Sequence, residues 1–395
     1  MESSRSAEAS RAQAAEPGAA GIAASDGVLD GASEQAGLGD PLGRMTPPLS
    51  PPVEGDRLIS QLQGLIGERY EIEDRAAIRQ QLTEQLQGLG FDVEAQTFDD
   101  GRGGQGTNLV ATYGADAGGK DPIAAAKNSI LVGAHYDTVQ GSPGADDNGT
   151  GVAVLLELAA LYAQEQQAGP KQSGQGRHPE PGRLAGGSLA GGRSLTLVFF
   201  DLEEAGLLGS LAFTAQPENL RPIHSAVILD MLGASCGEPG CQQYPAALEG
   251  SLLQGKALSD VGDFIAVVGE ANRLDLLGVF GGGADAQEAA GGEDAGSDAP
   301  LTAQPRNARP DVLLVPVPLK GLLTPDVLRS DHAPFWLNGV GAVLVTDTAN
   351  LRSPHYHQPS DDFPTWIQRF CGDGPGGGGW GLAAVGPARW RVSAG

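Results

Sequence analysis

Apolar residues follow two periods along the chain, one typical of helices and one typical of buried strands. The helical period predicts helices over residues 57–66, 78–89, 151–162 and 207–215. Short or alternating apolar runs predict strands over residues 91–95, 108–113, 129–134, 195–200, 226–229, 264–268 and 341–345. Because these strands alternate with helices, we expect a single α/β domain with a mixed, mostly parallel central sheet flanked by helices.

Segments without either period lie at both ends of the chain and between these elements. Residues 1–54 are rich in Ala, Gly, Ser and Pro, which predicts a disordered, low-complexity tail. Residues 167–193 and 281–310 are predicted to be Gly/Pro-rich, solvent-exposed insertions within a domain that covers residues 55–370. Residues 371–395 form a Gly-rich tail in this interpretation.

Composition narrows the function classes. The 395 residues carry a formal net charge of −24, and such a chain repels nucleic-acid backbones and anionic membranes. No apolar run reaches the roughly 18–20 residues that span a bilayer, so we expect a soluble protein without a membrane partner. The acidic balance suits a protein that gathers carboxylates around cations.

The amino-terminal residues contain no clear targeting signal. Arg5 and Arg11 with scattered serines favour an organellar transit peptide, whereas Glu2, Glu8 and Glu16 argue against one, and no apolar core of a secretory signal follows. The compartment and the oligomeric state therefore stay open.

Two cysteines, Cys236 and Cys241, lie close together in the sequence. They could form a disulfide or remain free thiols, and a zinc-binding pair is less favoured because no second pair exists.

The first candidate chemistry is the pair His135 and Asp137 in LVGAHYDT, directly after an apolar run. Residues i and i+2 of a strand point the same way, so both side chains project at a carboxyl end, where α/β sheets place their active sites. A carboxylate beside a ligating imidazole fixes its tautomer. The alternative is a hydrogen-bonded pair with a structural role.

Carboxylates recur at comparable places. Asp146 and Asp147 stand in GADDNGTG before a helix, where they could cap the helix or present a carboxylate to a metal. Glu203 and Glu204 follow the clearest strand, and one could bind a cation while the other holds a water for deprotonation. Their alternative is a solvated loop. Asp230 ends a further apolar run.

Histidines complete the set in two later segments, SDHAPF with Asp331 and His332 and PHYHQPSD with His357. Two imidazoles and three carboxylates form a mixed nitrogen–oxygen ligand set that suits zinc: His135, Asp147, Glu204, Asp230 and His357. Five ligands exceed the need of one tetrahedral ion, whereas two ions about 3.5–4 Å apart that share one carboxylate would use all five.

The order of these motifs resembles that of the co-catalytic zinc exopeptidases of metallopeptidase family twenty-eight in clan MH. That family includes bacterial double-zinc aminopeptidases, related carboxypeptidases and glutaminyl cyclases. The resemblance covers most of residues 55–370 and implies the phosphorylase/hydrolase-like fold of zinc exopeptidases.

The resemblance also implies a role for each ligand. His135 and Asp230 would bind one Zn²⁺, and Glu204 and His357 would bind a second. Asp147 would bridge the two ions from a cis peptide bond to the next residue.

Three further residues receive catalytic roles from the same resemblance. Asp137 would orient His135 from behind, and Glu203 would be the general base and then the acid that protonates the leaving amine. Tyr356 would stabilise the tetrahedral oxyanion, and the segment with Asp331 would lie near the substrate.

These roles imply a zinc aminopeptidase that acts on peptides with a free amino terminus. Two alternatives stay open. A glutaminyl cyclase uses a similar frame with one zinc ion and no net hydrolysis. A non-catalytic metal-binding relic is the other, because residues 367–370 run into a Gly-rich tail where the family has a closing helix.

Overall fold

The computed structural model describes residues 55–113, 128–168, 194–245, 248, 252–253, 256–281 and 311–362. All of them belong to one compact unit, Leu49–Gly395. The predicted tails, the predicted insertions except for their first residues, and the segment 367–370 lie outside the described residues.

The described helices are α1 Gly55–Gln63, α2 Ile72–Gly88, α3 Gly151–Ala168, α4 Leu208–Thr214, α5 Pro217–Leu220, α6 Leu274–Gly281 and α8 His332–Leu337. The described strands are β1 Phe91–Asp99, β2 Gln105–Tyr113, β3 Ser129–His135, β4 Ser194–Phe200, β5 Ile223–Leu229, β6 Leu252–Leu253, β7 Lys256–Ala257, β8 Phe264–Glu270, β9 Asp311–Val317 and β10 Ala342–Thr346. No helix in these ranges is both long and apolar enough to cross a bilayer.

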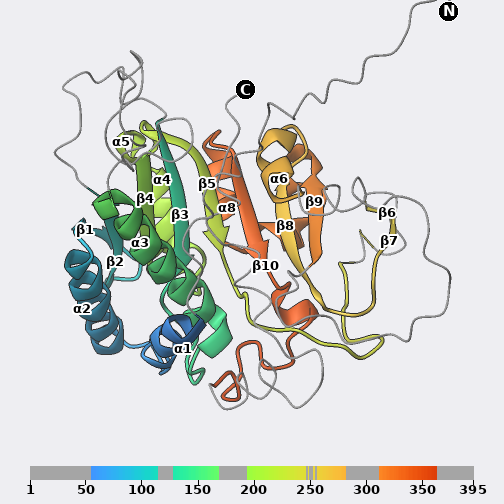
Figure 1. Cartoon of the computed structure of the whole chain (residues 1–395), viewed down its shortest axis with the longest axis horizontal. Coiled ribbons are helices and arrows are strands. Elements are labelled where there is room, and N and C mark those ends of the chain that lie inside the picture. Colours follow the sequence, from blue (N-terminus) through green and yellow to red (C-terminus); the bar gives the residue numbers. More distant parts are fainter. Residues whose placement is uncertain are drawn as a thin grey trace, which may run out of the picture. The chain divides into compact units, whose positions relative to one another are not determined.

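The described strands form an eight-stranded sheet in the order β1-β2-β4-β3-β5-β10-β8-β9, and β6 pairs with β7 in a separate hairpin (Figure 1). The neighbouring strands β4, β3, β5 and β10 run parallel to one another, and β8 runs parallel to β9. The pairs β1–β2, β2–β4 and β10–β8 are antiparallel. The predicted mixed α/β sheet is therefore confirmed. Its four central parallel strands bring their carboxyl ends to one edge.

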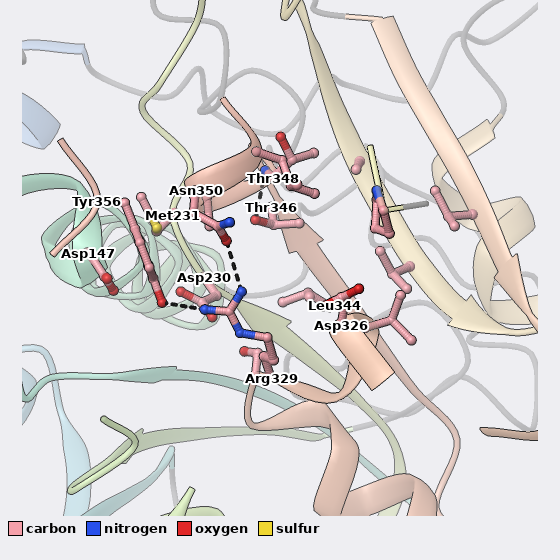
Figure 2. Close-up of a pocket in the computed structure, with 18 of the residues that line it drawn as sticks. Asp147, Asp230, Met231, Asp326, Arg329, Leu344, Thr346, Thr348, Asn350 and Tyr356 are labelled. Carbon is pink, nitrogen blue, oxygen red and sulfur yellow. Dashed lines mark hydrogen bonds between the residues drawn. The ribbon is translucent and has the colours of Figure 1, made fainter. Parts of the chain in front are cut away.

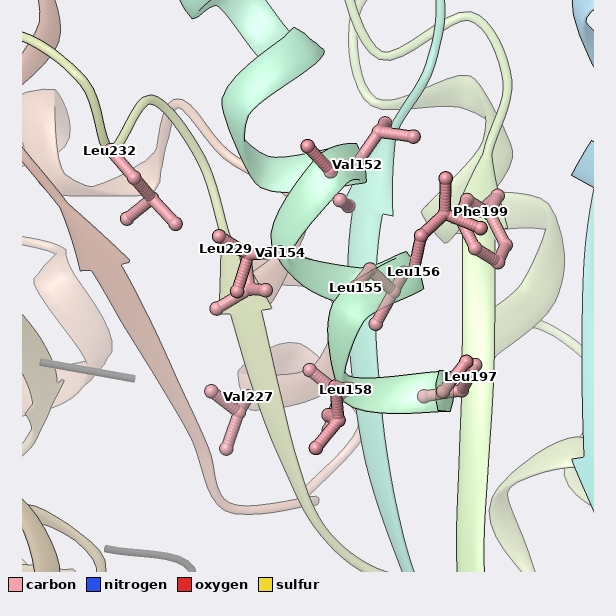
Figure 3. Packing of buried hydrophobic residues seen from close by; sticks show 14 of the residues in the cluster. Val152, Val154, Leu155, Leu156, Leu158, Leu197, Phe199, Val227, Leu229 and Leu232 are labelled. Atoms are coloured by element: carbon pink, nitrogen blue, oxygen red, sulfur yellow. The ribbon is translucent and has the colours of Figure 1, made fainter. Parts of the chain in front are cut away.

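Two apolar clusters cover the two faces of the sheet. On one face, α1, α2, α3 and α6 pack on alternate strand residues such as Val132 and Leu197, and Figure 3 shows α3 lying across β3, β4 and β5. On the other face, Phe213 of α4 and Trp336 of α8 pack on the intervening residues, such as Leu131. Since both faces of the central strands are buried, these strands read as continuous apolar runs in the sequence.

The apolar pattern did not predict several short or edge elements, among them β9, α6 and α8. β9 contains Pro316, and a proline argues against a strand in a sequence-based prediction. The structure accommodates this proline because β9 lies at the edge of the sheet. α6 and α8 have 8 and 6 residues, too short for a helical period to emerge.

Candidate metal centre and active site

The carboxyl ends of β4, β3, β5 and β10 carry the predicted site residues side by side. His135 ends β3, whose neighbours on either side are β4 and β5. Glu203 and Glu204 follow β4, and Asp230 follows β5 directly. His357 lies in the segment after β10, the next strand along. Sheet order thus brings together residues that lie far apart in the sequence.

Asp147 reaches the same edge from a helical turn, Ala145–Thr150, that leads directly into α3. Gly144 begins this turn with a positive φ of 62°, and a Cβ there would lie 2.6 Å from Nη2 of Arg69. The peptide bond from Asp147 to Asn148 is cis, as the family resemblance implied.

Asp147 stands between two groups of potential ligands. Its Oδ1 lies 3.4 Å from Nε2 of His135, which is 3.5 Å from Oδ1 of Asp230. Its Oδ2 lies 3.2 Å from Nε2 of His357, which is 3.0 Å from Oε2 of Glu204. Within each group the ligand atoms lie within 4.8 Å of one another, so either group could hold a metal ion.

Several atoms of these groups are buried without a hydrogen bond among the described residues. They are Asp147 Oδ2, Glu204 Oε1 and His357 Nε2. A buried carboxylate oxygen without a donor is costly, and a divalent cation removes that cost. The chemistry of the set, two imidazoles and three carboxylates, fits zinc.

Close packing of these groups shifts their pKa values in the metal-free protein. Burial and the nearby Asp147 raise the pKa of Glu204 to about 7. Burial alone would lower the pKa of His357, but Asp147 and Glu204 raise it to about 9. Burial alone would raise the pKa of Asp147, but His135 and His357 hold it well below its ordinary value. The cluster therefore already binds positive charge, in the form of protons.

Asp137 links the two central strands behind this cluster. Its carboxylate accepts hydrogen bonds from the backbone N–H groups of Glu203 at 3.0 Å and Glu204 at 3.2 Å. Oδ1 also lies 3.5 Å from Nδ1 of His135. One buried carboxylate thus contacts the imidazole on β3 and the loop that carries both glutamates.

Glu203 lies inside the cluster and is nearly buried. One of its carboxylate oxygens lies within 4.8 Å of ligand atoms of His135 and Glu204. Burial raises its pKa well above the ordinary value, and the negative charges of Asp230 and Asp331 add to this.

Tyr356 covers the outer side of the cluster. Its ring stacks on the imidazole of His357, with centroids 3.7 Å apart. Burial raises the pKa of its phenol, so the hydroxyl keeps its proton at neutral pH and can donate a hydrogen bond.

Asp331 and His332 lie at the start of α8 and are fully buried. Burial raises the pKa of Asp331 to about 7 and lowers that of His332 to about 4. The His332 ring packs edge-on against Trp336 at 4.5 Å, so this imidazole is part of the core below the site.

The structure also shows supporting residues to which the sequence reasoning gave no role. Asp361 accepts the backbone N–H groups of Asp146 at 2.9 Å and Asp147 at 3.0 Å. Asn148 accepts the N–H of Met231 at 3.1 Å and so ties the turn to the residue after Asp230. The sequence signal that could have indicated a role for Asp361 is its position four residues after His357.

Arg69 is a buried cation behind the same turn. Its guanidinium donates to the carbonyl oxygens of Leu65, Tyr136 and Gly144 at 2.5, 2.6 and 3.0 Å. Burial lowers its pKa to about 10, while the charges of Asp137 and other site carboxylates raise it. It stays protonated and connects the segment after α1 to the end of β3.

Cys236 and Cys241 form a disulfide, which decides between the alternatives that the sequence left open. The bridged loop follows Asp230 and leads to Tyr244 and Pro245, which line a cavity beside the ligand cluster.

The chain matches known proteins in this part of its sequence. Residues 108–261 match peptidase family M28. Over 267 residues the chain is 32% identical to the uncharacterized protein YfbL of Escherichia coli, covering 66% of this chain and 65% of that protein. It is 30% identical over 123 residues to aminopeptidase YwaD of Bacillus subtilis, covering 31% of this chain and 22% of that protein.

Solved structures agree on the fold. A leucine aminopeptidase precursor of Bacteroides thetaiotaomicron superposes with a TM-score of 0.52 at 17% identity, covering 87% of this chain and 97% of that one. A glutaminyl cyclase of the same organism gives a TM-score of 0.51 at 16% identity, covering 87% and 98%. At these identities the likeness concerns the fold alone.

The sequence matches and the fold together support a peptidase of family M28. The chain matches this family over residues 108–261, which supports its membership. It spans less than two thirds of the length of the two relatives described above.

Proposed function

We propose that the chain is a zinc-dependent aminopeptidase, which hydrolyses the peptide bond after the first residue of peptides with a free amino terminus. The observation that carries this proposal is the position of Asp147, whose two carboxylate oxygens lie beside His135 and His357. His135 with Asp230, and Glu204 with His357, would each hold one zinc ion, and Asp147 would be shared. When bound, such ions lower the pKa of a bound water and polarise the scissile carbonyl.

Glu203 would move the proton in this reaction. It would accept the proton that the attacking water loses as the C–O bond forms, and donate it to the amine nitrogen as the C–N bond breaks. Its burial among the ligands supports this role, because the proton acceptor lies next to the place where the water is held. Asp137 would keep the glutamate in place through the backbone N–H that it accepts.

Tyr356 would donate its hydroxyl hydrogen to the oxyanion that develops on the scissile carbonyl. This residue lines the same cavity as Glu203 and Asp230. A zinc site with an open coordination position could also hold the free α-amine of a peptide, which would favour cleavage from the amino terminus.

Metal analysis and a chelator-controlled assay test the proposal. We expect about two zinc ions per chain and release of nitroaniline from amino-acyl nitroanilides that stops when the zinc is removed. Glu203→Gln should keep its zinc and lose about 10²–10⁴-fold in kcat. The matched variant Glu94→Gln, at an exposed position on β1, should behave like the wild type. A fully active Glu203→Gln protein, or activity that survives zinc removal, contradicts the proposal.

The same experiments separate hydrolysis from cyclisation of an amino-terminal glutamine, the alternative that the sequence left open. One zinc ion per chain, together with ammonia release from glutaminyl peptides and no cleavage, would favour a cyclase. The shared position of Asp147 between two ligand groups favours two ions and hydrolysis.

A further inference from the structure

The cavity beside the ligand cluster is acidic at one end and apolar along its wall. Its volume is about 210 Å³. Strand residues line the wall, among them Val268 of β8, Val315 of β9 and Leu344 of β10. Among the described residues that line it, Arg329 is the single arginine or lysine.

Neutral groups hold the Arg329 side chain. Its Nη2 donates to the Tyr356 hydroxyl oxygen at 2.9 Å, and its Nη1 donates to Oδ1 of Asn350 at 2.9 Å (Figure 2). The guanidinium carbon lies 5.7 Å from the centroid of the Tyr356 ring. Within the described part of the chain, no carboxylate forms an ion pair with it.

This arrangement leaves a cation with free donors at the cavity. A guanidinium has five N–H donors in a fixed plane, and the contacts to Tyr356 and Asn350 leave the remainder available. Arg329 is exposed, so an incoming group can reach it. The group that best matches a planar set of N–H donors is a carboxylate, which accepts two hydrogen bonds at once.

We propose that Arg329 binds the terminal carboxylate of a short peptide, so that the enzyme prefers dipeptides. This inference rests on the proposed function and names its substrate class. The Tyr356 ring stacks on the His357 imidazole, and its hydroxyl accepts a hydrogen bond from Arg329, so Tyr356 connects the ligand cluster to the guanidinium. Arg329 lines the same cavity as Glu203 and Asp230, so the terminal carboxylate of a short peptide that is cleaved there would face the guanidinium.

The two ends of a dipeptide then meet different groups. The amino terminus faces the ligand cluster, and the carboxyl terminus faces Arg329. A longer peptide places a neutral peptide group beside the guanidinium and leaves the cation without an anionic partner. Discrimination between a carboxylate and its uncharged amide is therefore the property that this geometry predicts.

A matched pair of substrates tests it: leucyl-glycine, with a free carboxylate, and leucyl-glycinamide, with that charge removed. We expect kcat/KM of the zinc-loaded wild type to be about 10–100-fold higher for leucyl-glycine, the range of one charge-assisted contact. In Arg329→Met this ratio should fall to about one, mainly through KM, and Arg329→Lys should keep part of it. Arg273→Met, which removes a half-buried arginine paired with Asp275, should leave the ratio unchanged.

The ratio of the two kcat/KM values distinguishes carboxylate binding from a role in which Arg329 only holds Tyr356 in place. Loss of that second role would slow hydrolysis of both substrates alike. A wild type that hydrolyses both compounds equally, or an Arg329→Met protein that keeps the preference, overturns the inference. Failure of the proposed function has another signature, since neither compound would then be cleaved. In that case calorimetric binding of the two compounds to wild type and Arg329→Met decides the inference by the same ratio.

Discussion

The carboxylate of Asp361 lies directly behind Asp147 and accepts its backbone N–H at 3.0 Å. The same carboxylate accepts a second hydrogen bond, from the backbone N–H of Asp146 at 2.9 Å. Asp147 and Asp361 belong to segments that lie far apart in the sequence, because Asp147 precedes α3 and Asp361 follows β10. The segment that carries His357 therefore also fixes the carboxylate that stands between both ligand groups.

From this contact we predict that Asp361→Asn weakens zinc binding and lowers kcat/KM by about 10–100-fold, the usual effect of residues that hold metal ligands. The amide can accept one N–H but presents its own donors to the other. Zinc titration and steady-state kinetics measure both effects. Asp92→Asn, an exposed change on β1, is the control. Unchanged zinc affinity in Asp361→Asn would contradict this account of Asp147.

Much of this site could be predicted from sequence because its residues follow apolar strands. His135, Glu204 and Asp230 come at or just after strand ends, and the carboxyl ends of parallel strands share one edge. The ligand set and its order then indicated a dinuclear centre. The cis bond at Asp147 came from the family resemblance, since no local pattern encodes it.

The supporting residues could not be predicted in the same way. Arg69 follows a helix in a polar segment, and nothing in its neighbourhood indicates that it becomes buried against carbonyl groups from three separate segments. Arg329 stands in a short irregular segment before α8. Such roles depend on which loops meet in three dimensions, and hydrophobic periodicity carries no information about that.

Asp137 gives a second prediction, because its carboxylate holds the loop of both glutamates. In Asp137→Asn, the amide nitrogen would face the N–H of Glu203 or of Glu204, and one hydrogen bond would become a repulsive contact. We expect about a 10–100-fold loss of kcat/KM with weaker zinc binding. Kinetics at saturating zinc separate the two losses. If added zinc restored full activity, Asp137 would act on metal affinity alone.

Arg69 gives a prediction about stability. Arg69→Met removes the donors of several buried carbonyl groups, and each unsatisfied group costs about 1–3 kcal/mol. We therefore expect a loss of about 3 kcal/mol or more in the free energy of unfolding, measured by urea denaturation of the metal-free protein. Arg221→Met, at an exposed arginine that follows α5, should change stability by less than about 0.5 kcal/mol. Equal stability of both variants would show that Arg69 holds no loop in place.

The buried carboxyl groups predict how the stability of the metal-free protein changes with pH. Burial raises the pKa of Glu204 and of Asp331 to about 7, and that of Asp361 to about 6. A group with a raised pKa in the folded state stabilises the fold while it is protonated, and this stability is lost as pH rises through that pKa. The raised pKa of His357, about 9, acts in the same direction. The lowered pKa of His332, about 4, acts in the opposite direction below about pH 6.5, but three carboxyl groups outweigh this one imidazole. The lowered pKa of Asp147 affects stability only at more acidic pH, below its ordinary value of 3.8.

The melting temperature of the metal-free protein should therefore fall between pH 5 and pH 8. Glu204→Gln removes one of these titrations, so its melting temperature should fall less steeply over the same range. Zinc binds the deprotonated ligands, so the rise in melting temperature on adding zinc should be larger at pH 8 than at pH 5. Calorimetric melting in chelator and in excess zinc measures both trends. A metal-free protein that becomes more stable towards pH 8 would mean that these carboxyl groups are not buried together as the structure has them.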